Sequence, residues 1–555
     1  MKKTIIYQTL PRLFGNMNPS PVRNGDLARN GAGKFSAFSP AVLNDLKALG
    51  ITHVWFTGVI EHATQTDYSF CGIAKDHPAI VKGKAGSPYA IKDYYDVDPD
   101  LAENPHRRMA EFEELVRRSH EAGLRVIIDF VPNHVARQYK SDVHVGFVDD
   151  LGEKDDVSIA FSPRNNFYYI PGQPFALNFF AHNEGVAYGE FPARATGNNL
   201  FSPAAGKDDW YETVKLNYGV NYADGGSKHF EPVPDTWRKM LDILRFWASK
   251  GVDGFRCDMA EMVPVEFWAW VIPEIRKEYS IVFIGEVYNP AEYRNFIANG
   301  QFDFLYDKVG LYDILRDVIC RRVAPREITR AWQSIDGLQP SMLNFLENHD
   351  EQRIASDFFA ADPWAAIPAM IVAAFINSGP VMIYNGQELG ERGMDEEGFS
   401  GRDGRTSIFD YWSMESVREW LKDELPEDRK RLRAMYACIL NAAQSEQTVV
   451  QGSFFDLMYA NEGNPRFDAG CLYAFMRAFQ NEAMLVAVNF GLTEQRAFIR
   501  IPREAFDVLN IKDNGAARTL ELFGGETSIA ALTSVYPFET VIPPRGGVAV
   551  KFTYL

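Results

Sequence analysis

The sequence predicts a (β/α)8 barrel that carries an inserted subdomain after its third strand and a C-terminal β-sandwich. Three observations support this fold class. Over most of the chain, short runs rich in β-branched residues alternate with longer helical patterns, which is typical of βα units around a parallel sheet. A segment of irregular composition, 135–234, interrupts this alternation. From about residue 451 onward the hydrophobic period changes to two, which indicates β-structure.

The alternating part of the chain contains enough strands to close a barrel. The predicted strands are 4–9, 53–58, 125–131, 252–257, 281–287, 302–306, 342–347 and 381–385. Helical patterns lie between them, for example at 40–49, 109–122, 236–249, 264–278 and 364–377. Eight strands, each followed by a helix, is the number that a (β/α)8 barrel requires. We therefore assign 1–134 and 235–447 to the barrel.

The two remaining segments are expected to fold separately from the barrel. An insertion as long as 135–234 is more typical of a subdomain than of a structureless loop. The segment 448–555 contains alternating runs at 472–476 and 484–488 that are separated by turns, which predicts an all-β domain.

Composition and charge limit the classes of partner. Hydrophobic residues make up 46% of the 555 residues and charged residues 24%, a balance typical of a soluble globular protein. The net charge of −17 would repel a polyphosphate, so we expect no nucleic-acid partner. The polar stretch after Lys2 and Lys3 argues against a secretion signal, and the apolar run 365–376 is too short to cross a membrane. We therefore expect a cytoplasmic protein with no membrane partner.

Four predicted strands end in ionisable residues. The segments are DFVPNH at 129–134, GFRCD at 254–258, IGEV at 284–287 and ENHD at 347–350. Residues i and i+2 of a strand share a face, so the Arg256 guanidinium is expected to keep the Asp258 carboxylate ionised, as a nucleophile requires. Any one of these segments alone would be an ordinary charged loop. Because barrel strands present their carboxyl ends at one face, the four together predict one active site.

In this order the four segments resemble the signature regions of the α-amylase family of glycoside hydrolases and transglycosidases (glycoside hydrolase family 13). SPYAIKDYY at 87–95 is similar to the tyrosine-bearing segment before the family's third strand, and YNGQE at 384–388 to the end of its eighth strand. The long insertion resembles the family's domain B. The resemblance therefore extends over nearly the whole chain.

The resemblance implies a retaining reaction on an α-glucosidic bond. Asp258 matches the family nucleophile, Glu286 matches the general acid/base, and Asp350 matches the third carboxylate, which holds sugar hydroxyls. Tyr89, His134 and His349 match residues that bind the sugar before the cleaved bond, and Arg256 is grouped with them as a substrate-binding residue.

The residues after the nucleophile depart from the family pattern. Many endo-acting members carry Lys-His there, and these residues contact sugar beyond the cleaved bond, whereas this chain has Glu261 and Met262. The acceptor subsites therefore differ. For Glu261 two interpretations stay open, a substrate contact and a solvated loop charge.

A second departure concerns metal. Calcium-dependent members use the asparagine that matches Asn133 and an aspartate of domain B, and in TVKLNY at 213–218 Lys215 occupies the aspartate's place. An ammonium beside Asn133 would repel calcium, so we expect no metal and no cofactor. If the alignment slips by one residue, Lys215 would instead be exposed.

Three functions remain open at this point. The leading one is a hydrolase of α-linked glucose oligo- or polysaccharides, with its preference between α-1,4 and α-1,6 linkages undetermined. A transglycosidase of the same family would use the same catalytic groups. A glucan- or partner-binding protein without catalysis is disfavoured, because Asp258, Glu286 and Asp350 are all present.

Overall fold

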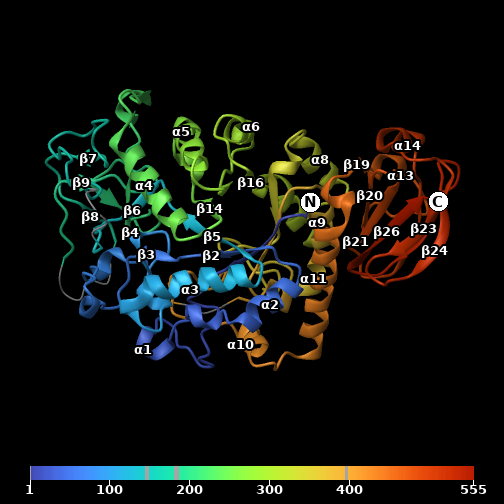
Figure 1. Cartoon of the computed structure of the whole chain (residues 1–555), viewed down its shortest axis with the longest axis horizontal. Coiled ribbons are helices and arrows are strands. Elements are labelled where there is room, and N and C mark those ends of the chain that lie inside the picture. Colours follow the sequence, from blue (N-terminus) through green and yellow to red (C-terminus); the bar gives the residue numbers. More distant parts are fainter. Residues whose placement is uncertain (1, 144–148, 180–186, 394–397, 400, 555) are drawn as a thin grey trace.

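Eight parallel strands close into a barrel in the computed structural model, which describes residues 2–143, 149–179, 187–393, 398–399 and 401–554 (Figure 1). In chain order they are β1 (Ile5–Thr9), β2 (His53–Phe56), β5 (Arg125–Phe130), β14 (Gly254–Cys257), β15 (Val282–Gly285), β16 (Phe304–Tyr306), β17 (Met342–Phe345) and β18 (Val381–Tyr384). Each begins and ends within two residues of its predicted bounds. The barrel prediction is therefore confirmed.

Helices surround the barrel. They include α1 (Leu27–Asn30), α2 (Pro40–Ala48), α3 (Arg108–Glu121), α4 (Asp235–Ser249), α5 (Val265–Arg276), α6 (Tyr293–Ala298), α7 (Asp313–Ile319), α8 (Glu327–Ser334), α9 (Ile367–Phe375), α10 (Glu415–Leu421) and α11 (Glu427–Ser445). Local chemistry sets their ends: Ser39 accepts a hydrogen bond from the N–H of Val42, and Pro40 begins α2 with its backbone already restricted to a helical φ.

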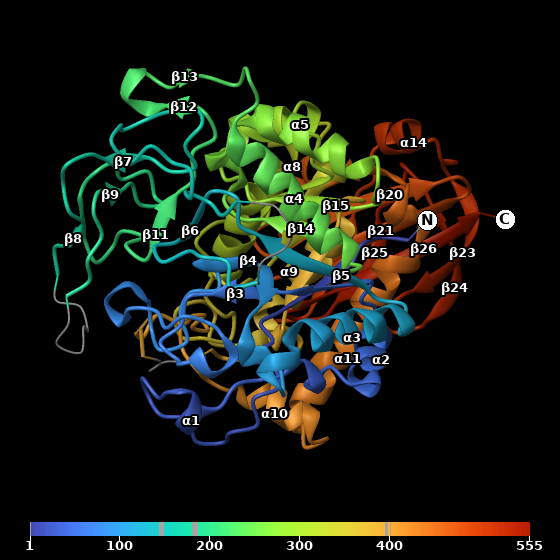
Figure 2. The ribbon, with the colours of Figure 1, turned by 60° about the vertical axis from the view of Figure 1, so that its left-hand side comes forward.

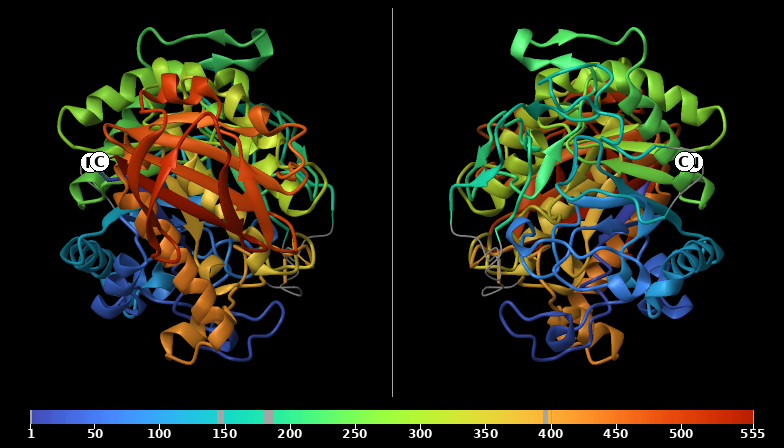
Figure 3. Two further views of the ribbon diagram at one scale, coloured as in Figure 1. Left: turned by 90° about the vertical axis from the view of Figure 1, so that its right-hand side faces the viewer. Right: turned by 90° about the vertical axis from the view of Figure 1, so that its left-hand side faces the viewer.

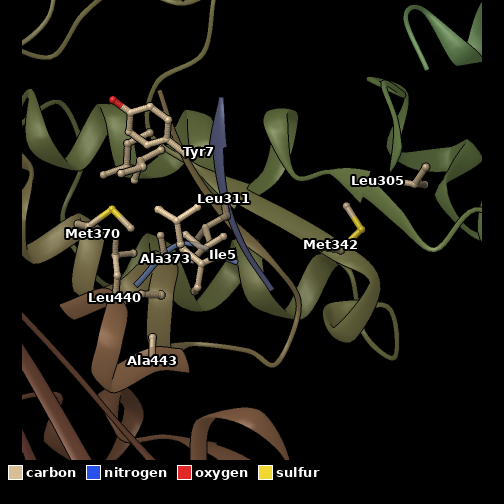
Figure 4. Packing of buried hydrophobic residues seen from close by; sticks show 14 of the residues in the cluster. Ile5, Tyr7, Leu305, Leu311, Met342, Met370, Ala373, Leu440 and Ala443 are labelled. Carbon is tan, nitrogen blue, oxygen red and sulfur yellow. The ribbon is translucent and has the colours of Figure 1, made fainter. Parts of the chain in front are cut away.

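Helix α9 explains the long apolar run in the sequence. Every one of its residues is buried, because the helix packs against β17 of the barrel, against α11 and against two strands of the C-terminal sheet. Figure 4 shows Ile5 and Tyr7 of β1 in this core with Met370 of α9 and Leu440 of α11. No helix in the described parts of the chain is long and apolar enough to span a membrane.

Short strands fill the insertion between β5 and α4. They are β6 (His134–Ala136), β7 (Tyr169–Ile170), β8 (Ala176–Leu177), β9 (Ala193–Arg194), β10 (Ala204–Ala205), β11 (Thr213–Lys215), β12 (Val220–Asn221) and β13 (Ser227–Lys228). The antiparallel pairing of β11 with β6 returns the insertion to the end of β5. Figure 2 shows these strands together on one side of the barrel. Nearby, β3 (Ile60–His62) pairs with β4 (Ile91–Val97).

The C-terminal segment forms an antiparallel sheet domain on the other side of the barrel (Figure 3). The strands are β19 (Ser453–Asp456), β20 (Leu472–Phe479), β21 (Glu482–Asn489), β22 (Gln495–Ile499), β23 (Gly515–Glu521), β24 (Thr527–Leu532), β25 (Phe538–Ile542) and β26 (Gly546–Tyr554). Six of them pair in the order β19-β20-β21-β26-β23-β24, and β22 pairs with β25. The short helices α12 (Gln447–Val450), α13 (Met458–Asn461) and α14 (Arg503–Leu509) accompany them.

Candidate active site

A cleft of about 610 Å³ opens at the carboxyl ends of the barrel strands. Six of the seven site residues expected from the sequence line it: Tyr89, His134, Asp258, Glu286, His349 and Asp350. The seventh, Arg256, is on β14 and has no exposed surface. The structure thus brings all of the expected residues to one place, as the meeting of strand ends in a barrel requires.

Arg256 connects the two carboxylates that end neighbouring strands. Its Nη1 donates to Asp258 Oδ1 at 2.8 Å, and its Nη2 lies 2.7 Å from Glu286 Oε2. Nη1 is also 3.3 Å from Asp129 Oδ1, because Asp129 of β5 stands beside Arg256 in the parallel register. The rigid fork of a guanidinium presents several donors in fixed directions, which suits it to contact several carboxylates at once.

Arg256 lowers the pKa of Asp258, as expected, but its effect is smaller than that of burial. Burial raises that pKa well above its usual range, and the charges of Glu286, Asp129 and Asp350 add to this effect against the opposing effect of Arg256. Burial likewise raises the pKa of Asp129 to about 6. One guanidinium therefore faces three carboxylates, and the pKa values of Asp258 and Asp129 stay above their usual range despite its charge.

The loops after β14 and β15 are joined through Glu286 and Glu261. Glu286 Oε2 accepts a hydrogen bond from the N–H of Met259 at 2.7 Å, and Oε1 accepts one from the Tyr288 hydroxyl at 2.6 Å. Glu261 Oε2 accepts from the N–H groups of Tyr288 at 3.1 Å and Asn289 at 3.0 Å. Glu261 is therefore a partner of the neighbouring loop, which neither of the two interpretations of the sequence anticipated.

Beside these carboxylates the cleft carries neutral hydrogen-bonding side chains. The Tyr89 hydroxyl lies 2.6 Å from His349 Nε2, and their rings stack with centroids 5.2 Å apart. Gln8 holds the other ring nitrogen of His349 at 2.7 Å. Burial lowers the pKa of His349 and of His134 to about 3, so both imidazoles are uncharged at neutral pH and suited to bind hydroxyl groups.

Comparison with known proteins agrees with this geometry. The family model described as alpha amylase, catalytic domain, matches residues 40–431. The chain belongs to the α-amylase family of glycoside hydrolases.

Similar proteins match over most of the chain. Neopullulanase 2 of Thermoactinomyces vulgaris is 21% identical over 520 residues, which cover 90% of this chain and 72% of that protein. The structure of a noncanonic maltogenic α-amylase, AmyB of Thermotoga neapolitana, superposes with a TM-score of 0.64 at 19% identity, covering 100% of this chain and 99% of that one. An α-amylase of Geobacillus thermoleovorans complexed with acarbose has a TM-score of 0.64 at 18% identity, covering 99% and 98%.

Within this α-amylase-family barrel, a buried lysine occupies the junction with the insertion. Lys215 pairs with His134 in the register of β11 and β6, and its side chain is only 2% exposed. Its Nζ donates to Asn133 Oδ1 and to the Met262 carbonyl oxygen at 3.3 Å. The alternative of an exposed lysine is therefore excluded. Both partners are uncharged, so burial lowers the pKa of Lys215 to about 7.

Sequence reasoning missed several residues that line the cleft of this family member. Tyr288 lies two residues after Glu286, so the alternation of side chains along an extended segment pointed to it. Trp210 comes from the insertion, with its ring centroid 5.1 Å from that of His134, and Arg405 comes from a loop after β18. Neither stands in a regular pattern, so only the folded chain brings them to the site.

Proposed function

We propose that the protein is a retaining hydrolase of α-glucosidic bonds in malto-oligosaccharides or in fragments of starch and glycogen. The observation that carries this proposal is the Arg256 bridge between Asp258 and Glu286 at the floor of the cleft. A retaining reaction needs a carboxylate nucleophile and a carboxylic acid held at a fixed, short separation on either side of the sugar carbon.

In the first step Asp258 attacks the anomeric carbon. Arg256 engages Oδ1, so we assign the attack to the other oxygen, Oδ2. A bond forms between Oδ2 and the carbon, the glycosidic bond breaks, and the proton of Glu286 moves to the departing oxygen.

In the second step water takes the place of the departed sugar. Its oxygen bonds to the anomeric carbon, its proton passes to Glu286, and the bond to Asp258 breaks. Two inversions return the α-configuration. Asp350, which is 42% exposed in the cleft, and the neutral His134 and His349 are assigned to the sugar hydroxyls.

A transglycosidase is the alternative, because it differs only in the acceptor that replaces water. The names of two similar proteins, a neopullulanase and a maltogenic α-amylase, support hydrolysis. Incubation with maltoheptaose separates the two reactions. Hydrolysis increases reducing ends as chains shorten, whereas transfer redistributes chain lengths at a constant number of reducing ends.

The Asp258→Asn variant tests the nucleophile, because an amide has the same shape but cannot attack. We expect turnover of maltoheptaose to fall by at least about 1,000-fold with an unchanged melting temperature. The control is Asp336→Asn on the exposed surface, which is expected to leave turnover unchanged. Activity of the Asp258 variant within tenfold of the unmodified protein contradicts the assignment.

The Glu286→Gln variant tests the acid. Protonation of the departing oxygen matters less when that group is a good leaving group, so an aryl α-glycoside is expected to lose less than maltoheptaose in the first step. Equal losses on both substrates would assign the acid to another residue.

We also propose that no calcium ion binds beside Asn133. Two observations support this: the Lys215 amine engages Asn133 Oδ1, and its other partner is a carbonyl oxygen rather than a carboxylate. A cation with high charge density prefers several anionic oxygens, which these contacts do not supply.

A further inference from the structure

The loops that carry the two reacting carboxylates bind each other reciprocally. The side chain of Glu286, at the end of β15, accepts from the backbone N–H of Met259 in the loop after β14. In the opposite direction, the side chain of Glu261, in the loop after β14, accepts from the backbone of Tyr288 and Asn289 after β15. We propose that Glu261 is a positioning residue that fixes this pair of loops and thereby holds the Tyr288 hydroxyl on Glu286.

The backbone next to the nucleophile needs such support. Met259 has φ of +43°, in the left-handed region that a side chain with a Cβ adopts at a cost of about 1–2 kcal/mol. Such conformations persist when surrounding contacts determine them. Two carboxylates provide those contacts: Glu286 accepts from the N–H of Met259 itself, and Glu261, two residues further along, accepts from the backbone of the loop after β15.

The contacts of the Glu286 side chain also determine which of its oxygens carries the proton. Oε2 faces the N–H of Met259 and the Arg256 guanidinium, both of which repel a hydrogen on that oxygen. Oε1 faces only the Tyr288 hydroxyl among the hydrogen-bond partners in the described part of the chain, and a hydroxyl can either donate or accept. Oε1 is therefore the oxygen that carries the proton for the departing group, and once the proton has left, Oε1 accepts from the Tyr288 hydroxyl as it does in the structure.

Tyr288 depends on Glu261 for this role. Its ring lies in the cleft lining, and its backbone N–H is held by Glu261 Oε2, so the hydroxyl reaches Glu286 from a fixed backbone. Without that anchor the loop after β15 is free to move, and the hydroxyl no longer stays 2.6 Å from Oε1. Glu261 acts through Tyr288 and does not itself reach the reacting atoms.

This inference rests on the proposed role of Glu286 as the acid, and the experiment compares two variants of Glu261 on two substrates. Glu261→Ala removes both acceptor contacts, whereas Glu261→Gln keeps one side-chain oxygen that can accept from both N–H groups. We expect Glu261→Ala to lose about 10- to 100-fold in kcat on maltoheptaose, but less than about threefold in the first step on an aryl α-maltoside. Glu261→Gln is expected to stay within about threefold on both.

A double-mutant cycle adds a readout that a purely structural role would not change. If Glu261 acts through Tyr288, Tyr288→Phe is expected to show the same dependence on the leaving group. The double variant is then expected to lose clearly less than the product of the two single losses. The matched control is Glu274→Ala on α5, where the carboxylate contacts only the neighbouring Lys277 among the described ion pairs.

Each outcome separates the two proposals. Equal losses of Glu261→Ala on both substrates, a loss in Glu261→Gln as large as in Glu261→Ala, or independent effects in the cycle would overturn the positioning role. An unmodified protein that cleaves no α-glucoside overturns the proposed function instead. If only Glu261→Ala fails to fold, the Glu261→Gln and Tyr288→Phe variants still decide the question.

Discussion

Two buried cations lie in the floor of the cleft and at its border with the insertion, and they have opposite surroundings. Arg256 has no exposed surface and is within 3.3 Å of carboxylate oxygens of Asp129, Asp258 and Glu286. Lys215 is 2% exposed, and its partners are the amide oxygen of Asn133 and a backbone carbonyl oxygen.

The pKa values of the two cations move in opposite directions for this reason. Carboxylates raise the pKa of Arg256 well above its ordinary value despite burial, so it remains charged and organises the site. Burial lowers the pKa of Lys215 to about 7, with no anion to oppose it. A buried charge is thus maintained where anions surround it, whereas a buried amine among neutral oxygens gives up its proton within the neutral pH range.

The largest effect on stability is expected from Arg256→Met. This change leaves three buried carboxylates without their common cation, and breaking a buried ion pair from one side typically costs about 3–5 kcal/mol. We expect the free energy of unfolding to fall by this amount and turnover of maltoheptaose to fall at least about 100-fold. Chemical denaturation and initial rates measure both. A variant that keeps wild-type stability would show that the three carboxylates hold protons and do not need the cation.

A smaller effect is expected from Lys215→Ala, which leaves Asn133 Oδ1 without its donor and opens a space beneath Tyr222. An unsatisfied buried polar group costs about 1–3 kcal/mol, and we expect a loss of unfolding free energy in this range. Lys215→Met keeps the aliphatic stem and separates packing from hydrogen bonding, so its loss is expected to be smaller. If neither variant is less stable, the hydrogen bond to Asn133 contributes nothing.

The pH dependence of stability tests whether buried Lys215 loses its proton near neutral pH. Between about pH 7 and pH 10.5 the unfolded chain binds one more proton at Lys215 than the folded chain does, so the contribution of Lys215 to stability rises with pH in this window. From pH 7 to pH 8 the stability of the unmodified protein relative to Lys215→Met is expected to rise by about 1 kcal/mol. A difference that stays constant over this interval would mean that Lys215 keeps its charge when buried.

The smallest effect is expected from removal of divalent cations. A bound metal stabilises the folded state by mass action, so stripping an ion that occupied the Asn133 position would lower the melting temperature. With Lys215 at that position, we expect EDTA to leave both turnover and melting temperature nearly unchanged. A fall of several degrees that calcium alone reverses would contradict the proposal.

The sequence alone was sufficient to predict the barrel and which residues form the site. The strands β5, β14, β15 and β17 were recognisable because each is a short, largely apolar run with ionisable residues at or just after its carboxyl end. Parallel barrel strands all present their carboxyl ends at one face, so local sequence was sufficient to group Asp258, Glu286 and Asp350. The lysine beside Asn133 was also predictable, because in TVKLNY at 213–218 Lys215 occupies the place of the family's calcium-binding aspartate.

Only the tertiary structure decided the electrostatic state of the site and the contacts between its loops. Arg256 alone indicated a low pKa for Asp258, but burial in the packed barrel raises that pKa, and the charges of Glu286 and Asp129 on neighbouring strands add to the effect. The partners of Glu261 likewise lie 27 and 28 residues further along the chain. The physical reason is common to both cases. A pKa shift and a hydrogen bond between loops both depend on distances of a few ångströms between residues far apart in sequence, and the packing of the whole barrel sets these distances.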